Sequence, residues 1–166
     1  MILLGLDFDN TLVRYDNLFY QLALEKGLID TSVDADKIAI RDHLRAKDLE
    51  DEFTLLQGEV YGLRILEAEP AEGMIDALYD LYQHGISMVL VSHKTRTPYK
   101  GPKYNLHAAA LNWLEKYKFF SHEGLNWTSN QVYFEETKQK KIHRISQLEC
   151  SHFVDDLPDI LSDIKE

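Results

Sequence analysis

Apolar residues along the chain gather in short runs that alternate with segments of helical spacing. The first run, residues 2–8, is almost continuously apolar, which is typical of a strand buried on both faces of a parallel sheet. The predicted strands lie at residues 2–8, 86–91, 131–134 and 152–154. The predicted helices lie at residues 70–85, 106–117, 138–148 and from about 158 onward. This alternation predicts an α/β fold in which helices flank a parallel sheet on both faces.

The segment from residue 15 to residue 66 interrupts the alternation. It is dense in charged residues and carries no strand signals. Its helical patterns lie at residues 18–24, 35–45 and 53–66. We therefore predict a small helical insertion at 15–66, with residues 1–14 and 67–166 forming the core domain.

Composition limits the classes of partner. The 166 residues suit one compact domain, and a hydrophobic fraction of 45% suffices for a buried core. The 18 basic and 28 acidic residues give a formal charge of −10, which offers no electrostatic footprint for a nucleic-acid backbone. A small anionic substrate stays open, because a bound cation can invert the local field. The single cysteine, Cys150, excludes an internal disulfide and a thiolate metal cluster.

Nothing in the sequence indicates a membrane or a secretory route. The strand-like run begins at once, without a basic segment or a cleavage-site pattern before it. No apolar stretch approaches the ~20 residues that a membrane span needs. We expect a soluble, cytoplasmic protein, and the sequence leaves open whether it forms a homo-oligomer.

Polar clusters follow three of the predicted strands, at residues 7–11, 92–94 and 155–156. Ligands of open α/β sheets bind outside the carboxyl ends of the strands, so these clusters are expected to converge on one crevice. The acids in the clusters are Asp7, Asp9, Asp155 and Asp156. Four carboxylates placed together repel one another, and a hard divalent cation with oxygen ligands removes that repulsion. The clusters therefore predict a Mg²⁺ site.

Taken in order, these elements resemble the haloacid dehalogenase (HAD)-like hydrolase superfamily, phosphatase type. The matching elements are Asp-x-Asp-x-Thr at residues 7–11, Ser92 after the second strand, a lysine near a helix start, and the pair Asp155-Asp156. The resemblance spans nearly the whole chain outside the insertion. It implies a three-layer, Rossmann-like fold, Mg²⁺ as cofactor, a cap formed by the insertion, and hydrolysis of a small phosphate monoester.

The resemblance also implies roles for single residues. Asp7 is the expected nucleophile, which takes the phosphoryl group as an aspartyl-phosphate. Asp9 is the expected general acid and base, and its backbone carbonyl is an expected Mg²⁺ ligand. Ser92 is expected to bind the phosphoryl oxygens. Asp7, Asp155 and Asp156 are the remaining expected metal ligands.

The catalytic lysine has three candidates, Lys138, Lys140 and Lys141. Lys141 opens the helical pattern most naturally, since Ile142, Ile145 and Leu148 follow it, so we choose Lys141 while leaving the other two open. In this role it balances the charge of the nucleophile and holds the phosphate.

Four further residues are expected at the substrate, namely Asn10, Thr11, His93 and Lys94. Thr11 is also expected to stabilise the loop after the first strand. Asn10 departs from the commonest form of the element, which has Gly, but Asn tolerates unusual backbone angles. Pro98, Gly101 and Pro102 predict a long loop after Lys94, at residues 94–104.

Two alternatives stay open. A phosphomutase or another phosphotransferase of the same superfamily uses the same residues, and a non-catalytic phosphate-binding or regulatory module keeps the pocket without turnover. A dehalogenase has no need of Asp9, so that residue favours phosphoryl transfer. The sequence names neither the substrate nor the pathway.

Overall fold

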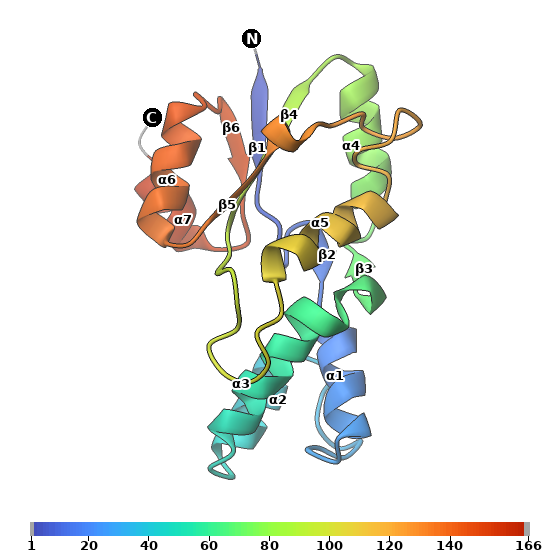
Figure 1. Cartoon of the computed structure of the whole chain (residues 1–166), viewed down its shortest axis with the longest axis vertical. Coiled ribbons are helices and arrows are strands. Elements are labelled where there is room, and N and C mark those ends of the chain that lie inside the picture. Colours follow the sequence, from blue (N-terminus) through green and yellow to red (C-terminus); the bar gives the residue numbers. More distant parts are fainter. Residues whose placement is uncertain (1, 165–166) are drawn as a thin grey trace. The chain divides into compact units, whose positions relative to one another are not determined.

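The apolar run near the N-terminus forms a central strand of the sheet. The structure is a computed structural model that describes residues 2–164. In it, β1 (Leu3–Leu6) lies between β4 (Ser87–His93) and β6 (His152–Val154), and β5 (Val132–Glu135) pairs with the far side of β4 (Figure 1). All three pairings are parallel. The predicted parallel sheet is confirmed.

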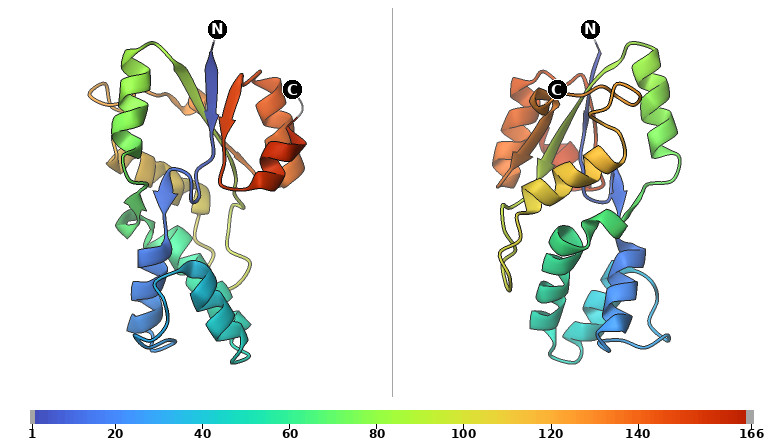
Figure 2. Two further views of the ribbon diagram at one scale, coloured as in Figure 1. Left: turned by 180° about the vertical axis from the view of Figure 1, so that it is seen from behind. Right: turned by 45° about the vertical axis from the view of Figure 1, so that its right-hand side comes forward.

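Helices cover both faces of this sheet. α6 (Lys138–Gln147) and α7 (Pro158–Asp163) lie on one side, and α4 (Met74–Gln83) lies on the other (Figure 1 and Figure 2). On the α6 side, Val89 and Val91 of β4 pack with Ile145 into an apolar cluster. The layers match the predicted α/β class, because a sheet buried on both faces needs helices on both faces.

Gly5 sits in the middle of β1, where a larger residue would have no space. A Cβ atom built on Gly5 would clash with the ring of Phe153 on the neighbouring strand and come within 3.0 Å of Cys150 Sγ. Gly5 therefore lets the Phe153 ring pack directly over the strand backbone, in the same apolar cluster as Val89 and Val91. Cys150 is partly buried there and acts as a small apolar residue.

The helix predicted to open at Pro70 begins later, so that prediction is wrong. Pro70 instead belongs to the short strand β3 (Glu69–Pro70), which pairs with β2 (Val13–Arg14). Gly73 has a left-handed φ of 70°, which an α-helix does not accommodate, and α4 starts at the next residue.

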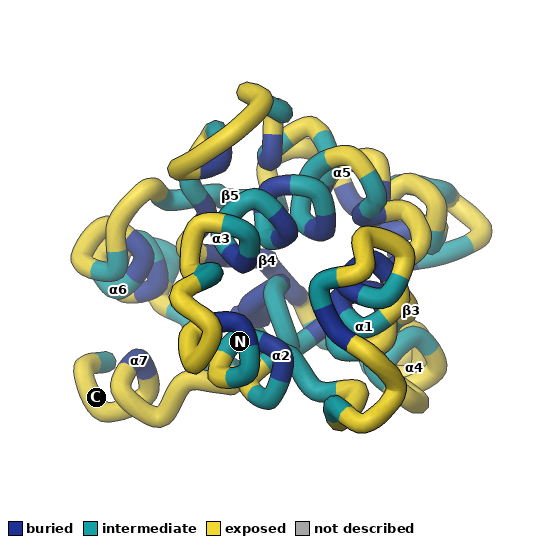
Figure 3. The backbone as a smooth tube through the Cα atoms, turned by 90° about the horizontal axis from the view of Figure 1, so that it is seen from below, coloured by how far each residue is buried: buried dark blue, intermediate teal, exposed yellow. Residues whose placement is uncertain are grey.

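The 15–66 segment is helical, as its charge and spacing predicted. It forms α1 (Asp16–Glu25), α2 (Lys37–Arg45) and α3 (Glu50–Gly58). The single helix predicted at 53–66 is interrupted: a π-helical turn follows at Glu59–Leu63 and a 3₁₀ turn at Ile65–Glu67. Buried and exposed positions alternate along all three helices (Figure 3), as expected of helices that cover a core on one side.

Aromatic side chains form the core of this helical region. Phe19 of α1 stacks on Phe53 of α3 with ring centroids 5.8 Å apart, and Tyr61 meets Tyr15 edge-on at 4.8 Å. The buried Trp113 of α5 (Leu106–Lys116) donates its indole N–H to the Ala68 carbonyl at 2.9 Å. These contacts join α1 to α3 and to the turn that follows α3, and they tie Ala68 to the last turns of α5.

The predicted loop after Lys94 exists, and part of it packs on α3. A Cβ atom on Gly58 would lie only 3.2 Å from Pro98, and Lys100 forms an ion pair with Asp51. The contacts of the chain accordingly divide into two compact units. The sheet unit comprises residues up to Val13, Pro70–Thr95 and residues from Leu114 onward; the helical unit comprises Arg14–Glu69 and Arg96–Trp113. The helical unit thus contains a second segment, 96–113, beside the predicted insertion, whose role as a cap stays a prediction.

None of the helices within residues 2–164 combines the length and the apolar composition that a bilayer-spanning helix needs.

Candidate active site

The carboxyl ends of β1, β4 and β6 carry the candidate residues. Asp7 follows β1 directly, and its backbone N–H donates to the Val154 carbonyl of β6 at 2.9 Å. Ser92 lies near the end of β4, and Asp155 follows β6. Since parallel strands end at one edge of the sheet, residues more than 140 positions apart meet within the sheet unit.

Lys141 links the first and the last of these clusters. Its Nζ lies 2.7 Å from Asp7 Oδ1 and 2.5 Å from Asp155 Oδ2, and the lysine side chain is only 2% exposed. Thr137 caps α6 by accepting from the Lys140 N–H, which sets Lys141 in the first turn. Among the three candidates, Lys138 pairs with Asp163 and Lys140 is exposed, so Lys141 is the one that the structure brings to Asp7.

Burial and charge perturb two of the acids. Burial raises the pKa of Asp7 to about 6, and the Lys141 ammonium opposes this shift without cancelling it. Burial and the Asp155 charge also raise the pKa of Asp156, while a hydrogen bond from the Asn10 side chain acts in the opposite direction. Both shifts come first from burial, which disfavours the charged form of a carboxyl group.

Three of these acids fit a divalent cation. Asp7, Asp155 and Asp156 each offer one carboxylate oxygen, and the three oxygens lie within 4.8 Å of one another. The donors are all oxygen, as hard cations such as Mg²⁺ require. Together with Asp9, the four carboxylates face two buried ammonium groups, Lys141 and Lys94, which leaves a formal charge of −2 that one divalent ion balances.

Asp9 pairs with Lys94, and the sequence did not indicate this pair. Lys94 Nζ lies 2.9 Å from both carboxylate oxygens of Asp9. The lysine side chain is 3% exposed and that of Asp9 25%. The register of the two strands explains this pair. Leu6 of β1 pairs with Leu90 of β4, so Asp9 and Lys94, three and four residues further on, follow neighbouring strands at nearly the same height in the sheet.

Two hydroxyl groups of the predicted site are buried without a hydrogen-bond partner among the described residues. They are Ser92 Oγ and Thr11 Oγ1. Buried hydroxyls are normally paired, so each is suited to bind a ligand that supplies oxygen atoms. Ser92 is the more buried residue, with 1% exposure.

The remaining predicted residues lie at the edge of this group. Asn10 has a left-handed φ of 60°, which is the conformation that Gly adopts most readily, and Asn substitutes for Gly there at low cost. His93 ends β4 and is exposed. The roles expected for Asn10, Thr11 and His93 at a substrate, and for the Asp9 carbonyl at a metal, stay predictions.

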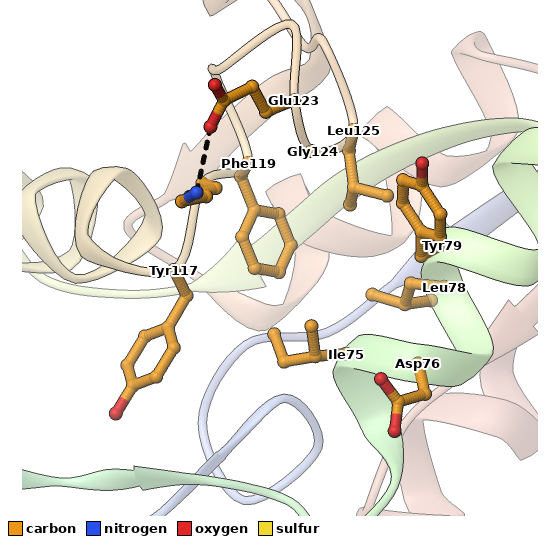
Figure 4. Close-up of a pocket in the computed structure, with 10 residues that line it drawn as sticks. Ile75, Asp76, Leu78, Tyr79, Tyr117, Phe119, Glu123, Gly124 and Leu125 are labelled. Atoms are coloured by element: carbon orange, nitrogen blue, oxygen red, sulfur yellow. Dashed lines mark hydrogen bonds and ion pairs between the residues drawn. The ribbon is translucent and has the colours of Figure 1, made fainter.

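An apolar cavity of about 240 Å³ lies elsewhere in the sheet unit. Ile75 and Leu78 of α4 face Phe119 and Leu125 across it (Figure 4). An ion pair of 2.9 Å between Lys118 and Glu123 lies at its border. None of the candidate active-site residues lines this cavity.

Comparisons with known proteins give a distant structural likeness. No family model and no curated protein matches the chain. One similar solved structure is a haloacid dehalogenase-like family hydrolase from Xanthomonas campestris, with 12% identity, a TM-score of 0.45, and coverage of 92% of this chain and 72% of the other. Another is a HAD-superfamily hydrolase from Ehrlichia chaffeensis, with 16% identity, a TM-score of 0.43, and coverage of 97% and 81%. At these levels of similarity, only the residues of the site bear on function.

Proposed function

We propose that the chain is a Mg²⁺-dependent phosphatase that hydrolyses a small phosphate monoester through an aspartyl-phosphate on Asp7. The observation that carries this proposal is the buried Asp7 carboxylate, which Lys141 holds at 2.7 Å beside the acids of a three-carboxylate cation site. An ordinary turn after a strand keeps its carboxylate and any nearby lysine in water, because burying both charges costs desolvation energy.

The first half of the reaction transfers the phosphoryl group to the protein. An Asp7 oxygen attacks phosphorus, and a new P–O bond forms while the ester P–O bond breaks. The buried Ser92 hydroxyl, which has no hydrogen-bond partner within residues 2–164, donates to a phosphoryl oxygen, and Lys141 balances the charge of the nucleophile. For this step Asp9 is protonated, unlike the ionised form counted in the charge balance above; it gives its proton to the departing oxygen and becomes a carboxylate, so the product leaves as an alcohol. A bound divalent cation supplies positive charge that offsets repulsion between Asp7 and the phosphoryl group.

The second half releases phosphate. Asp9, now ionised, takes a proton from water, and the water oxygen attacks the phosphorus of the aspartyl-phosphate. The bond between Asp7 and phosphorus breaks, inorganic phosphate leaves, and both acids return to their starting states. A phosphomutase differs only in passing the group to a second alcohol instead of water.

The test is release of p-nitrophenol from p-nitrophenyl phosphate, with Mg²⁺ and with a chelator. We expect Mg²⁺-dependent turnover by the wild type and a loss of about 10⁴-fold in Asp7→Asn, because the nucleophile is removed. Asp76→Asn, an exposed acid in the first turn of α4, is the matched control and keeps wild-type activity. Release without metal dependence, or equal release by Asp7→Asn, contradicts the proposal and favours a non-catalytic phosphate-binding module.

Substrate choice is tested separately. A panel of sugar, nucleotide and amino-acid phosphates, assayed for inorganic phosphate, identifies the class with the highest kcat/KM. A panel member that loses phosphate only when a second alcohol is present indicates a phosphotransferase.

A further inference from the structure

We propose that Lys94 is a positioning residue for Asp9, which it holds where Asp9 exchanges a proton with the leaving oxygen. This inference deepens the proposed function and rests on it. It differs from the role expected from the sequence, in which Lys94 binds the substrate directly.

The geometry commits the Lys94 ammonium to Asp9. Nζ lies 2.9 Å from each carboxylate oxygen, so two of its three hydrogens have an acceptor on the same side chain. A two-point contact fixes the rotation of the carboxylate as well as its distance. A lysine that only attracted an anionic substrate would need no such contact.

The main chain holds Lys94 in place for this contact. Its backbone N–H donates to the Glu135 carbonyl of β5 at 2.9 Å, one residue beyond β4. Its Nζ lies 5.3 Å from the centre of the Phe8 ring, a distance at which a ring face attracts a cation. Lys94 is therefore part of the packed strand end rather than of the loop that follows.

Burial supports a functional reason for the pair. Lys94 is 4% exposed, so its ammonium group has left water, which costs desolvation energy. A lysine in a surface ion pair stays in contact with water and does not bear this cost. The two acids of the Asp-x-Asp element thus each have a buried lysine: Asp7 has Lys141, and Asp9 has Lys94. Lys141 contacts Asp7 and Asp155, whereas Lys94 contacts Asp9.

Leaving-group chemistry provides the test. A proton donor matters for an alkyl phosphate, whose alkoxide is a poor leaving group, and matters little for 2,4-dinitrophenyl phosphate, whose phenolate departs without a proton. We expect Lys94→Met to lower kcat/KM for an alkyl phosphate by about 100-fold and for the dinitrophenyl ester by less than about 3-fold. Asp9→Asn should show the same selectivity, and the double variant should be no worse than Asp9→Asn.

Controls separate positioning from folding and from phosphate binding. Lys94→Arg, which keeps the charge and the carboxylate contact, should recover at least part of the alkyl phosphate activity. Full dinitrophenyl activity of Lys94→Met itself reports an intact fold. Equal losses on both esters in Lys94→Met show that Lys94 binds phosphate, and they overturn the inference. Unchanged activity on both esters overturns it as well. If Lys94→Met misfolds, loss of both activities in Lys94→Arg also overturns it. A wild type inactive on both esters overturns the proposed function and the inference together.

Discussion

The two units differ in what they bury. Within residues 2–164, four polar or charged residues are buried as a whole: Asp7, Ser92, Lys94 and Lys141. All four belong to the sheet unit and lie near one edge of its sheet. The described core of the helical unit is mainly apolar and aromatic, and each ion pair described there, such as that of Lys100 with Asp51, has at least one exposed side chain. The sheet unit therefore carries the cost of desolvated charge at the place where chemistry is proposed.

Removing one partner of the buried charges should have the largest effect. Lys141→Met leaves Asp7 and Asp155 close together without their shared cation, and we expect the unfolding free energy to fall by about 3–5 kcal/mol at pH 7. Urea unfolding of the metal-free protein measures it. If the unpaired Asp7 carboxylate causes the loss, the double variant Lys141→Met/Asp7→Asn should regain most of the lost unfolding free energy. No regain would contradict that explanation.

Truncating the aromatic core should destabilise without touching the chemistry. Phe53→Ala removes a ring that is 3% exposed and stacks on Phe19, and we expect a loss of about 3–4 kcal/mol. Mg²⁺ affinity, measured by calorimetry on the folded variant, should stay within about twofold of the wild type. A drop of about tenfold or more in the Mg²⁺ affinity of folded Phe53→Ala would break the distinction between the two units.

A pH series should reveal the burial of Asp7. Its folded-state pKa of about 6 lies above the ordinary value of 3.8, so its contribution to stability is greatest below about pH 4 and is lost as the pH rises through 6. Without metal, we expect the wild type to lose about 2–3 kcal/mol between pH 4 and 7 relative to Asp7→Asn. Denaturant melts of both proteins at each pH measure the difference. Equal pH slopes would contradict the raised pKa, and Mg²⁺ should reduce the effect at pH 7.

Strand positions could be predicted because strands buried on both faces are apolar at nearly every position, as 2–8 and 86–91 show. The convergence of Asp7 and Asp155 followed from the same rule, since both follow parallel strands. The start of α4 could not be predicted from Pro70, because the left-handed conformation of Gly73 decides it.

The pairing of Asp9 with Lys94 depends on strand register, which apolar runs do not encode. The grouping of residues 96–113 with the helical unit likewise depends on contacts such as that of Pro98 with Gly58, between residues 40 positions apart. The catalytic and metal-binding roles of the site residues stay predictions until turnover is measured.

The central place of β1 has a consequence for the order in which contacts form during folding. β1 pairs with β4 at a separation of about 84 residues, but with β6 only at a much longer one, because the Leu3 N–H donates to the hydroxyl of Ser151, 148 positions later. Contacts of such long range form late and slow the search for the native fold. The side of β1 that faces β6 therefore has no partner strand until late in folding, and this unpaired strand edge is the part of a folding intermediate most open to pairing with another chain.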